Sequence, residues 1–263
     1  MKIAVSGKGG VGKTTLVSLL AFVFASKGNK VLAIDADPDS NLGLSLGLSL
    51  KETKDILPLS EMKELIAERT GTKPGISNPF FKMNPKVDDI PEKYGKSINN
   101  DIKLLVLGGL KTGGAGCFCP ENALLKTLLK HLLVNREEIV LIDMEAGIEH
   151  LSRGTAQSVD ALIIVIDSGI KSLQTAYTIE RLAKELTIKN IFIVVNRIRT
   201  DEEKKKVQDE IKLPILGFIS FDQDILKQDQ IGNYRFDKNS KIVEEINSIV
   251  NSLCRGESMY SPE

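Results

Sequence analysis

The chain has 263 residues, of which 42% are hydrophobic, 27% are charged and 5% are aromatic. Its 35 basic and 35 acidic side chains cancel, so the sequence offers no broad positive field that would hold DNA or an anionic membrane. The length suits one α/β domain, expected to span residues 1–263, and no apolar run is long enough to cross a bilayer.

Apolar, β-branched runs alternate with amphipathic segments along most of the chain. This alternation predicts a doubly wound, mostly parallel α/β sheet that binds ligands at the carboxyl ends of its strands. The predicted strands are Lys2–Ser6, Lys30–Asp35, Ile102–Leu107, Ile139–Asp143, Ala161–Ile166, Ile191–Val195 and Ile215–Ile219. The predicted helices between them are Lys13–Lys27, Glu121–Leu133, Ser172–Leu186, Asp201–Glu210 and Ser240–Leu253.

The first predicted strand leads into the segment GKGGVGKT, residues 7–14, and then into a helix. This segment fits the phosphate-binding loop pattern G-x-x-x-x-G-K-[ST] in the strand–loop–helix context that the pattern requires. Its backbone N–H groups and the helix N-terminus favour phosphate oxygens. We expect Lys13 to contact the β- and γ-phosphates in catalysis and Thr14 to ligate Mg²⁺. The nucleotide-binding residues expected here are Gly7, Lys8, Gly9, Gly10, Val11, Gly12, Lys13, Thr14 and Thr15.

A second lysine, Lys8, follows the first glycine of the loop. With it the segment resembles the deviant phosphate loop of the superfamily that contains the nitrogenase iron protein, MinD and ParA. The resemblance implies a P-loop ATPase fold. It also implies that Lys8 acts in catalysis by reaching across a dimer interface to the nucleotide of the partner subunit.

Carboxylates follow two predicted strands at the edge where the phosphate loop lies. Asp35 and Asp37 end the second strand and begin the next loop, and Asp143 closes the strand at 139–143. Carboxylates in this place can organise the Mg²⁺ shell and orient an attacking water. We expect Asp35 and Asp143 to help hold Mg²⁺. The segment DADPDSN resembles the first switch of the superfamily, which implies that Asp37 positions the nucleophilic water.

The residues that follow these aspartates in the two loops are expected to have other roles. Asp39 and Asn41 are expected to cap a short helix over 42–46. Gly147 would let the backbone approach a γ-phosphate, and the stretch AGIE resembles the second switch of the MinD class. The roles of Glu145 and His150 stay open.

The base is expected to lie near the end of the sixth predicted strand, at Asn196-Arg197-Ile198-Arg199. A guanine-specific loop needs N-K-x-D, and Arg199 occupies the position of that aspartate, which favours ATP over GTP. The resemblance implies that Asn196 binds adenine, with Arg197 beside it in the ATP site. The segment 217–222 would complete the base pocket, mostly through its backbone.

Residues 51–100 interrupt the alternating pattern and are predicted to form an insertion on the surface of the domain. A helical stretch at Ser60–Arg69 precedes a segment rich in Gly, Pro and Asn, and Phe80 and Phe81 are expected to anchor it. A passive excursion and a lid near the nucleotide or dimer face remain equally open.

Two cysteines, Cys117 and Cys119, flank one phenylalanine on a glycine-rich loop. The N-terminus becomes polar too early for a signal peptide, so we expect a cytoplasmic protein in which cysteines remain thiols or bind metal. Two thiolates at this spacing form half of a four-thiolate site, and a symmetric dimer would supply the other half. Soft thiolates select Zn²⁺, Ni²⁺, Cu⁺ or an iron–sulfur cluster, and tetrahedral geometry would favour Zn²⁺ whereas square-planar geometry would suit Ni²⁺. Packing cysteines or a strained local disulfide are the alternatives. Cys254 is interpreted as incidental.

Several segments together resemble the nickel-insertion accessory ATPases of carbon monoxide dehydrogenase, the CooC family. They are the deviant phosphate loop, DADPDS, the insertion motifs NPKVDD and EKYG, CFCPEN, and DMEAGIEHLSRGT. The resemblance implies a homodimer that hydrolyses ATP with Mg²⁺, holds Ni²⁺ or Zn²⁺ between its subunits and serves carbon monoxide dehydrogenase. A sister branch that matures acetyl-CoA synthase is not separated by these motifs. No nucleic-acid or membrane partner is expected.

Two other functions fit the same superfamily. A positioning ATPase of the MinD or ParA type would bind a membrane or DNA, but the C-terminal segment has mixed charge rather than the basic amphipathic helix of MinD. An electron-transfer ATPase like the nitrogenase iron protein would use cysteines from two separate loops, and the stretch DMEAGIEH carries none.

Overall fold

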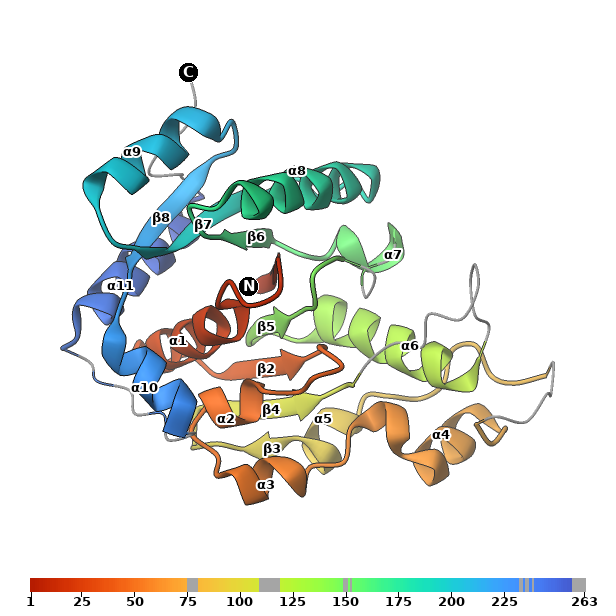
Figure 1. Ribbon diagram of the computed structural model, residues 1–263. Helices are drawn as coiled ribbons and strands as arrows, with labels where there is room; N and C mark the ends of the chain where they lie inside the picture. Colours follow the sequence, from red (N-terminus) through yellow and green to blue (C-terminus); the bar gives the residue numbers. More distant parts are fainter. Residues whose placement is uncertain are drawn as a thin grey trace.

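The computed structural model describes residues 1–74, 80–108, 119–148, 151, 153–231, 234, 237 and 239–256. Within these residues the chain forms one eight-stranded sheet with helices on both faces (Figure 1). The strands are β1 (Lys2–Gly7), β2 (Val31–Asp35), β3 (Lys96–Ser97), β4 (Ile102–Val106), β5 (Ile139–Asp143), β6 (Ala161–Ile166), β7 (Ile191–Ile198) and β8 (Ile215–Ser220). Their order is β3-β4-β2-β5-β1-β6-β7-β8, and only β3 runs antiparallel to its neighbour. The predicted doubly wound, mostly parallel sheet is therefore confirmed.

The helices form a layer on each face of the sheet (Figure 1). They are α1 (Lys13–Ser26), α2 (Leu42–Ser45), α3 (Leu50–Lys54), α4 (Lys63–Thr70), α5 (Ile90–Tyr94), α6 (Pro120–Asn135), α7 (Arg153–Ala156), α8 (Ile170–Glu185), α9 (Asp201–Glu210), α10 (Gln223–Ile231) and α11 (Lys241–Arg255), with a 3₁₀ turn at Leu59–Glu61. Apolar side chains of α1, α2 and α11 pack on one face, and those of α4, α6, α8 and α9 pack on the other. Among the helices described, none combines the length and the apolar character that a bilayer crossing needs.

Strand β1 shows why these segments fold as they do. All six of its residues are buried, and Ile3 and Val5 pack into one core cluster while Ala4 packs into the other. The middle of the strand is apolar because its successive side chains enter two apolar layers, as in a central parallel strand, while Lys2 and Ser6 at its ends are buried polar residues. The phosphate loop follows directly, so its base is fixed by the middle of the sheet.

The segment predicted as an insertion at 51–100 contributes side chains to the core of the domain. Leu59, Leu65, Ile66 and Ile90 are almost fully buried and join the core layer beneath α6. The segment also supplies β3, which extends the sheet at one edge. Phe80, by contrast, is 83% exposed, so the prediction that it anchors the segment is wrong. Aliphatic side chains of the short helices perform that anchoring, because they face α6 and the sheet.

The predicted helix at Ser60–Arg69 is shorter in the structure. The 3₁₀ turn ends at Glu61, Met62 intervenes with a non-helical ψ of 78°, and α4 begins at Lys63. The backbone N–H of Ser60 donates to the carbonyl oxygen of Leu107 at 3.0 Å, which ties this turn to the end of β4. The hydrogen bond to Leu107 thus replaces the first helical turn that the sequence predicts.

Candidate nucleotide-binding site

The loop at residues 7–13 has a positive φ at three glycines, Gly7, Gly10 and Gly12, and a side chain at two of them would also meet a close neighbour. A Cβ atom on Gly7 would lie 2.3 Å from the carbonyl oxygen of Val165 on β6. Gly12 has a φ of +94°, and a Cβ atom there would lie 2.3 Å from the Asn196 side-chain nitrogen. Backbone packing at Gly7 and a left-handed turn at Gly12 therefore set the shape of the loop before any ligand binds.

The two lysines of the loop differ in their surroundings. Lys13 is 7% exposed, and its ammonium group donates to the carbonyl oxygen of Lys8 at 3.5 Å. Lys8 is half-buried and its side chain does not line the cavity described next. An ammonium group held by a long bond to its own loop can exchange that bond for a phosphate oxygen at low cost.

A cavity of about 510 Å³ opens above the loop and gathers residues from five parts of the chain. The predicted site residues Gly9, Gly10, Gly12, Lys13, Thr14, Thr15, Asp37 and Arg197 line it, together with Asp39, Asn41, Leu44, Ser45, Glu145, Ala146 and Tyr234. Asp37 is therefore brought to the phosphate loop, as its proposed role requires. Tyr234 was missed at the sequence level, because no motif surrounds it.

Asp35 and Asp143 form a buried pair of carboxyl groups at adjacent strand ends. They occupy directly paired positions of β2 and β5, and their exposures are 0% and 1%. Burial, reinforced by the charge of Asp143, raises the pKa of Asp35 to about 8. Burial raises the pKa of Asp143 to about 6, although the Thr14 hydroxyl and the Lys13 ammonium group oppose the rise.

The surroundings of Asp143 fit a cation. Its Oδ1 atom is buried and accepts no hydrogen bond from any residue that the structure describes. A buried carboxylate oxygen without a donor is costly, and the Thr14 hydroxyl lies beside the same side chain. Magnesium binds carboxylate and hydroxyl oxygens together with water and phosphate. The three residues expected to hold Mg²⁺ thus lie together, and one of them, Thr14, also lines the cavity.

This pair yields a prediction for the pH dependence of stability. Because both pKa values are raised, the folded protein keeps protons that the unfolded chain releases above about pH 4. The pair therefore contributes less to stability as pH rises towards 8. Asp143→Asn removes one of the two charges. We expect its melting temperature, measured without Mg²⁺ or nucleotide, to rise relative to that of the wild type as the pH increases from about 5 to about 8. The exposed Asp88→Asn is the control, and a pH-independent difference for Asp143→Asn would contradict this reading.

The cap of α2 differs from the prediction. Asn41 occupies the N-cap position but makes no side-chain capping bond, and its amide donates instead to the carbonyl oxygen of Asp39 at 2.7 Å. The carboxylate of Asp35 accepts from the backbone N–H of Leu42 at 3.0 Å and from that of Asp37 at 3.2 Å. The capping role predicted for Asp39 and Asn41 is therefore wrong. Asp35 takes that role because it is buried beneath the loop and needs donors.

Asn196 lies against the phosphate loop. Its side-chain nitrogen donates to the carbonyl oxygen of Val11 at 2.8 Å, and its side-chain oxygen accepts from the N–H of Arg197 at 2.9 Å. Arg197 has a φ of 61°, which is unusual for a residue other than glycine. In this conformation Arg197 lines both the phosphate cavity and a second, narrower pocket. The end of β7 thus links the two.

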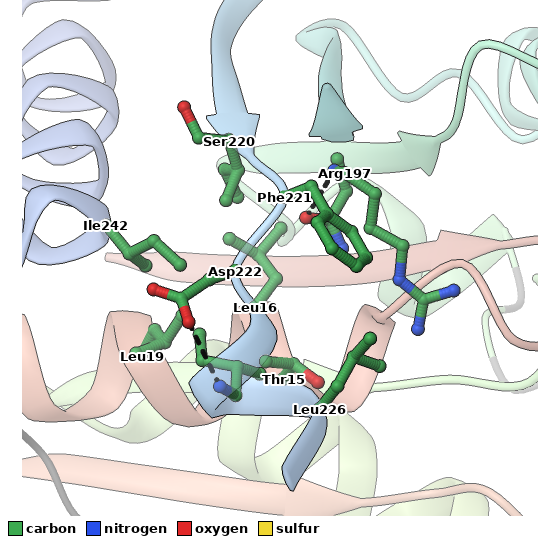
Figure 2. Close-up of a pocket in the computed structure, with 12 residues that line it drawn as sticks. Thr15, Leu16, Leu19, Arg197, Ser220, Phe221, Asp222, Leu226 and Ile242 are labelled. Atoms are coloured by element: carbon green, nitrogen blue, oxygen red, sulfur yellow. Dashed lines mark hydrogen bonds between the residues drawn. The ribbon is translucent and has the colours of Figure 1, made fainter. Parts of the chain in front are cut away.

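The second pocket lies between α1 and the loop that joins β8 to α10. Leu19 and Ile242 lie on one side of it, and Arg197 and Phe221 lie on the other (Figure 2). Its remaining lining residues are Thr15, Leu16, Asn196, Ile219, Ser220, Asp222, Ile225 and Leu226. The adenine site that we expect from the sequence, with segment 217–222 as one wall, coincides with this pocket. Apolar walls with a few polar groups suit a flat base.

Two contacts fix the wall of this pocket. The Arg199 guanidinium lies 4.3 Å from the centre of the Phe221 ring and forms a cation–π contact with it. Ser220 donates from its N–H at 2.8 Å and from its hydroxyl at 2.6 Å to the carboxylate of Glu245 on α11. Glu245 was missed at the sequence level, since it lies on the polar face of a helix with no motif.

The loop after β5 contacts the base of the phosphate loop. The Ser6 hydroxyl donates to the carbonyl oxygen of Gly147 at 2.6 Å, and Glu145 is exposed on the cavity wall. Glu145 thereby gains a location, although its role stays open. His150 lies outside the described residues.

The predicted metal ligands are only partly within the described structure. Cys119 is half-buried and is the N-cap residue of the 16-residue helix α6, while Cys117 lies outside the described residues. The positive end of a helix dipole favours a negatively charged group such as a thiolate. In the part of the chain that the structure describes, no cluster of three or more His, Cys, Asp or Glu side chains is arranged to hold a metal.

Comparisons with known proteins agree with this geometry. The model of the CobQ/CobB/MinD/ParA nucleotide binding domain matches residues 2–233. The carbon monoxide dehydrogenase accessory protein CooC of Rhodospirillum rubrum is 44% identical over 96% of both chains. An uncharacterised ATP-binding protein of Methanocaldococcus jannaschii is 43% identical over 97% of this chain and 98% of its own. Among solved structures, a chain of the MinC:MinD cell division protein complex of Aquifex aeolicus is similar, with a TM-score of 0.69 and 22% identity over 99% of this chain and 98% of that chain.

Proposed function

Because this chain belongs to the CobQ/CobB/MinD/ParA nucleotide-binding family and is an ATPase similar to CooC, we propose that it couples ATP hydrolysis to nickel insertion into carbon monoxide dehydrogenase. The 44% identity to a carbon monoxide dehydrogenase accessory protein over nearly the whole chain carries this proposal. The proposed unit is a single domain, residues 1–263, acting as a cytoplasmic homodimer without a nucleic-acid or membrane partner.

ATP is proposed to bind with its phosphates in the cavity above residues 7–14 and its base between α1 and the β8–α10 loop. Lys13 exchanges its bond to Lys8 for the β- and γ-phosphates, and Lys8 extends towards the nucleotide of the partner subunit. The location of Arg197 on both pockets supports this course of the nucleotide.

Hydrolysis is proposed to depend on Asp37. Its carboxylate accepts from the N–H of Asp39 at 2.9 Å, and its own N–H donates to Asp35, so the turn holds it on the cavity wall. From there it orients a water towards the γ-phosphate. Thr14, Asp143 and Asp35 would hold Mg²⁺, which neutralises charge on the phosphates.

Nickel is proposed as cargo, bound by Cys117 and Cys119 of both subunits. Four soft thiolates from two chains can bind Ni²⁺ or Zn²⁺ in one site on the two-fold axis. Cys119 lies at the start of α6, where the helix dipole supports a thiolate. Loss of the γ-phosphate moves the switch loops, changes the spacing of the thiolates and releases the ion to the client.

A reconstituted activation assay tests the proposal. Nickel-free carbon monoxide dehydrogenase is incubated with Ni²⁺, the purified chain and either Mg·ATP or a non-hydrolysable analogue. We expect CO oxidation to appear only with the chain and Mg·ATP, because release of the ion requires hydrolysis. Equal activation with the analogue or without the chain would reject the proposal. A parallel sample with nickel-free acetyl-CoA synthase distinguishes the two clients.

The positioning function receives less support. The apolar residues of α11 (Ile242, Ile246, Ile249 and Val250 among them) are buried against α1 and the sheet. An apolar helix face that forms part of the core is not available to insert into a membrane surface.

A further inference from the structure

Ser6 makes a buried connection that the proposed mechanism does not use. Its side chain is fully buried, directly before the phosphate loop. Its hydroxyl donates to the carbonyl oxygen of Gly147 at 2.6 Å and accepts from the N–H of the same residue at 3.3 Å. The carbonyl oxygen of Glu145 lies 3.2 Å from the same hydroxyl. One side chain thus serves both backbone groups of Gly147 and reaches a second carbonyl of that loop.

The two ends of this connection differ in freedom to move. Strand β1 is paired on both sides, with β5 and β6, and Gly7 packs directly on the backbone of Val165. Glu145 and Ala146, on the other side, are exposed and line the phosphate cavity. The Ser6 hydroxyl therefore joins a fixed strand to a loop that borders the phosphates.

We propose that Ser6 is a positioning residue for ATP hydrolysis, which holds the 145–147 loop against the phosphate cavity through Gly147. This inference rests on the ATPase part of the proposed function. Without the hydroxyl, the buried C=O group of Gly147 loses this donor, and its N–H keeps only the 2.7 Å bond to the carbonyl oxygen of Glu145 within the same loop. The loop then has no side-chain bond from Ser6 to hold it in place. Among the described residues, the Ser6 hydroxyl makes no hydrogen bond to a glycine or to Lys13 of the phosphate loop. A variant without this hydroxyl should therefore still bind nucleotide.

The test compares Ser6→Ala with Ser18→Ala. Ser18 is a matched control because it is 3% exposed and its hydroxyl donates within its own helix, to the carbonyl oxygen of Thr15 at 2.9 Å. Steady-state ATP hydrolysis, affinity for a fluorescent ADP analogue and amide hydrogen exchange are measured on the full chain. For Ser6→Ala we expect kcat to fall about tenfold while ADP affinity changes by less than about threefold.

Hydrogen exchange separates positioning from general damage. In Ser6→Ala the peptide covering 144–148 should exchange faster with ADP bound, while the peptide covering 7–14 is unchanged, and Ser6→Thr, which retains the hydroxyl, should recover part of kcat. A kcat within about twofold of wild type, or equal losses of kcat and ADP affinity, would overturn the inference. If the wild-type chain itself did not hydrolyse ATP, the proposed function would fail together with this inference. That outcome is distinguishable from failure of the inference alone, in which the wild type hydrolyses ATP.

Discussion

Replacement of Asp37 by asparagine is expected to lower kcat for ATP hydrolysis about 10²- to 10³-fold, because the carboxylate that orients the attacking water becomes neutral. Asparagine retains the oxygen that accepts from the N–H of Asp39, so the turn itself should keep its shape. Affinity for ADP should change little, since Lys13 and the loop N–H groups supply the phosphate contacts. Phosphate release and equilibrium ADP binding, measured on the same preparation, check both parts.

Asp39→Asn is the matched control for this measurement. Asp39 lies two residues away on the same cavity wall, is exposed, and has no proposed part in orienting water. It should hydrolyse ATP within about threefold of the wild-type rate. Equal losses in Asp37→Asn and Asp39→Asn would show that the charge of the segment matters rather than one carboxylate, and would remove Asp37 from its proposed role.

Replacement of both Cys117 and Cys119 by alanine is expected to abolish metal binding by the purified protein. The proposed site has only thiolate ligands, and a site that loses all four of them cannot retain a soft metal ion. Metal content is read by elemental analysis after dialysis with a stated excess of Ni²⁺ or Zn²⁺. ATP hydrolysis should persist, because the proposed catalytic groups do not include either cysteine and Cys119 does not line the phosphate cavity.

Cys254→Ala is the control for the cysteine variant. Cys254 is exposed on α11 and belongs to a different helix from Cys119. Its replacement should leave the metal content unchanged. If the double variant bound as much metal as wild type, the ion would have to lie on other ligands, and the intersubunit site would be rejected.

The parts of the fold that local patterns specify were predictable. The seven longer strands, the helix after the phosphate loop and the P-loop itself follow from apolar runs and one motif whose spacing is fixed by phosphate geometry. Strand β3 has only two residues, too few for any periodicity, and so could not be found. Helix α3 did carry a signal, since Ser49 and Glu52 form a capping box.

Other features depend on contacts between distant segments. The cap of α2 by Asp35 arises because β2 and β5 bury that carboxyl group beside Asp143, and only the sheet register shows it. Likewise, Ser6 and Gly147 are 141 positions apart, and no local pattern connects them. The exposure of Phe80 follows from how the insertion packs, which aromatic character alone does not decide.

Metal titration under two nucleotide states tests the central claim most directly. The chain is equilibrated with increasing Ni²⁺ or Zn²⁺ in the presence of either a non-hydrolysable ATP analogue or ADP, each with Mg²⁺, while light scattering reports its mass. The account predicts one ion per two chains, with an affinity that differs at least about fivefold between the nucleotide states. One ion per single chain, or equal affinity with ATP analogue and ADP, would contradict it.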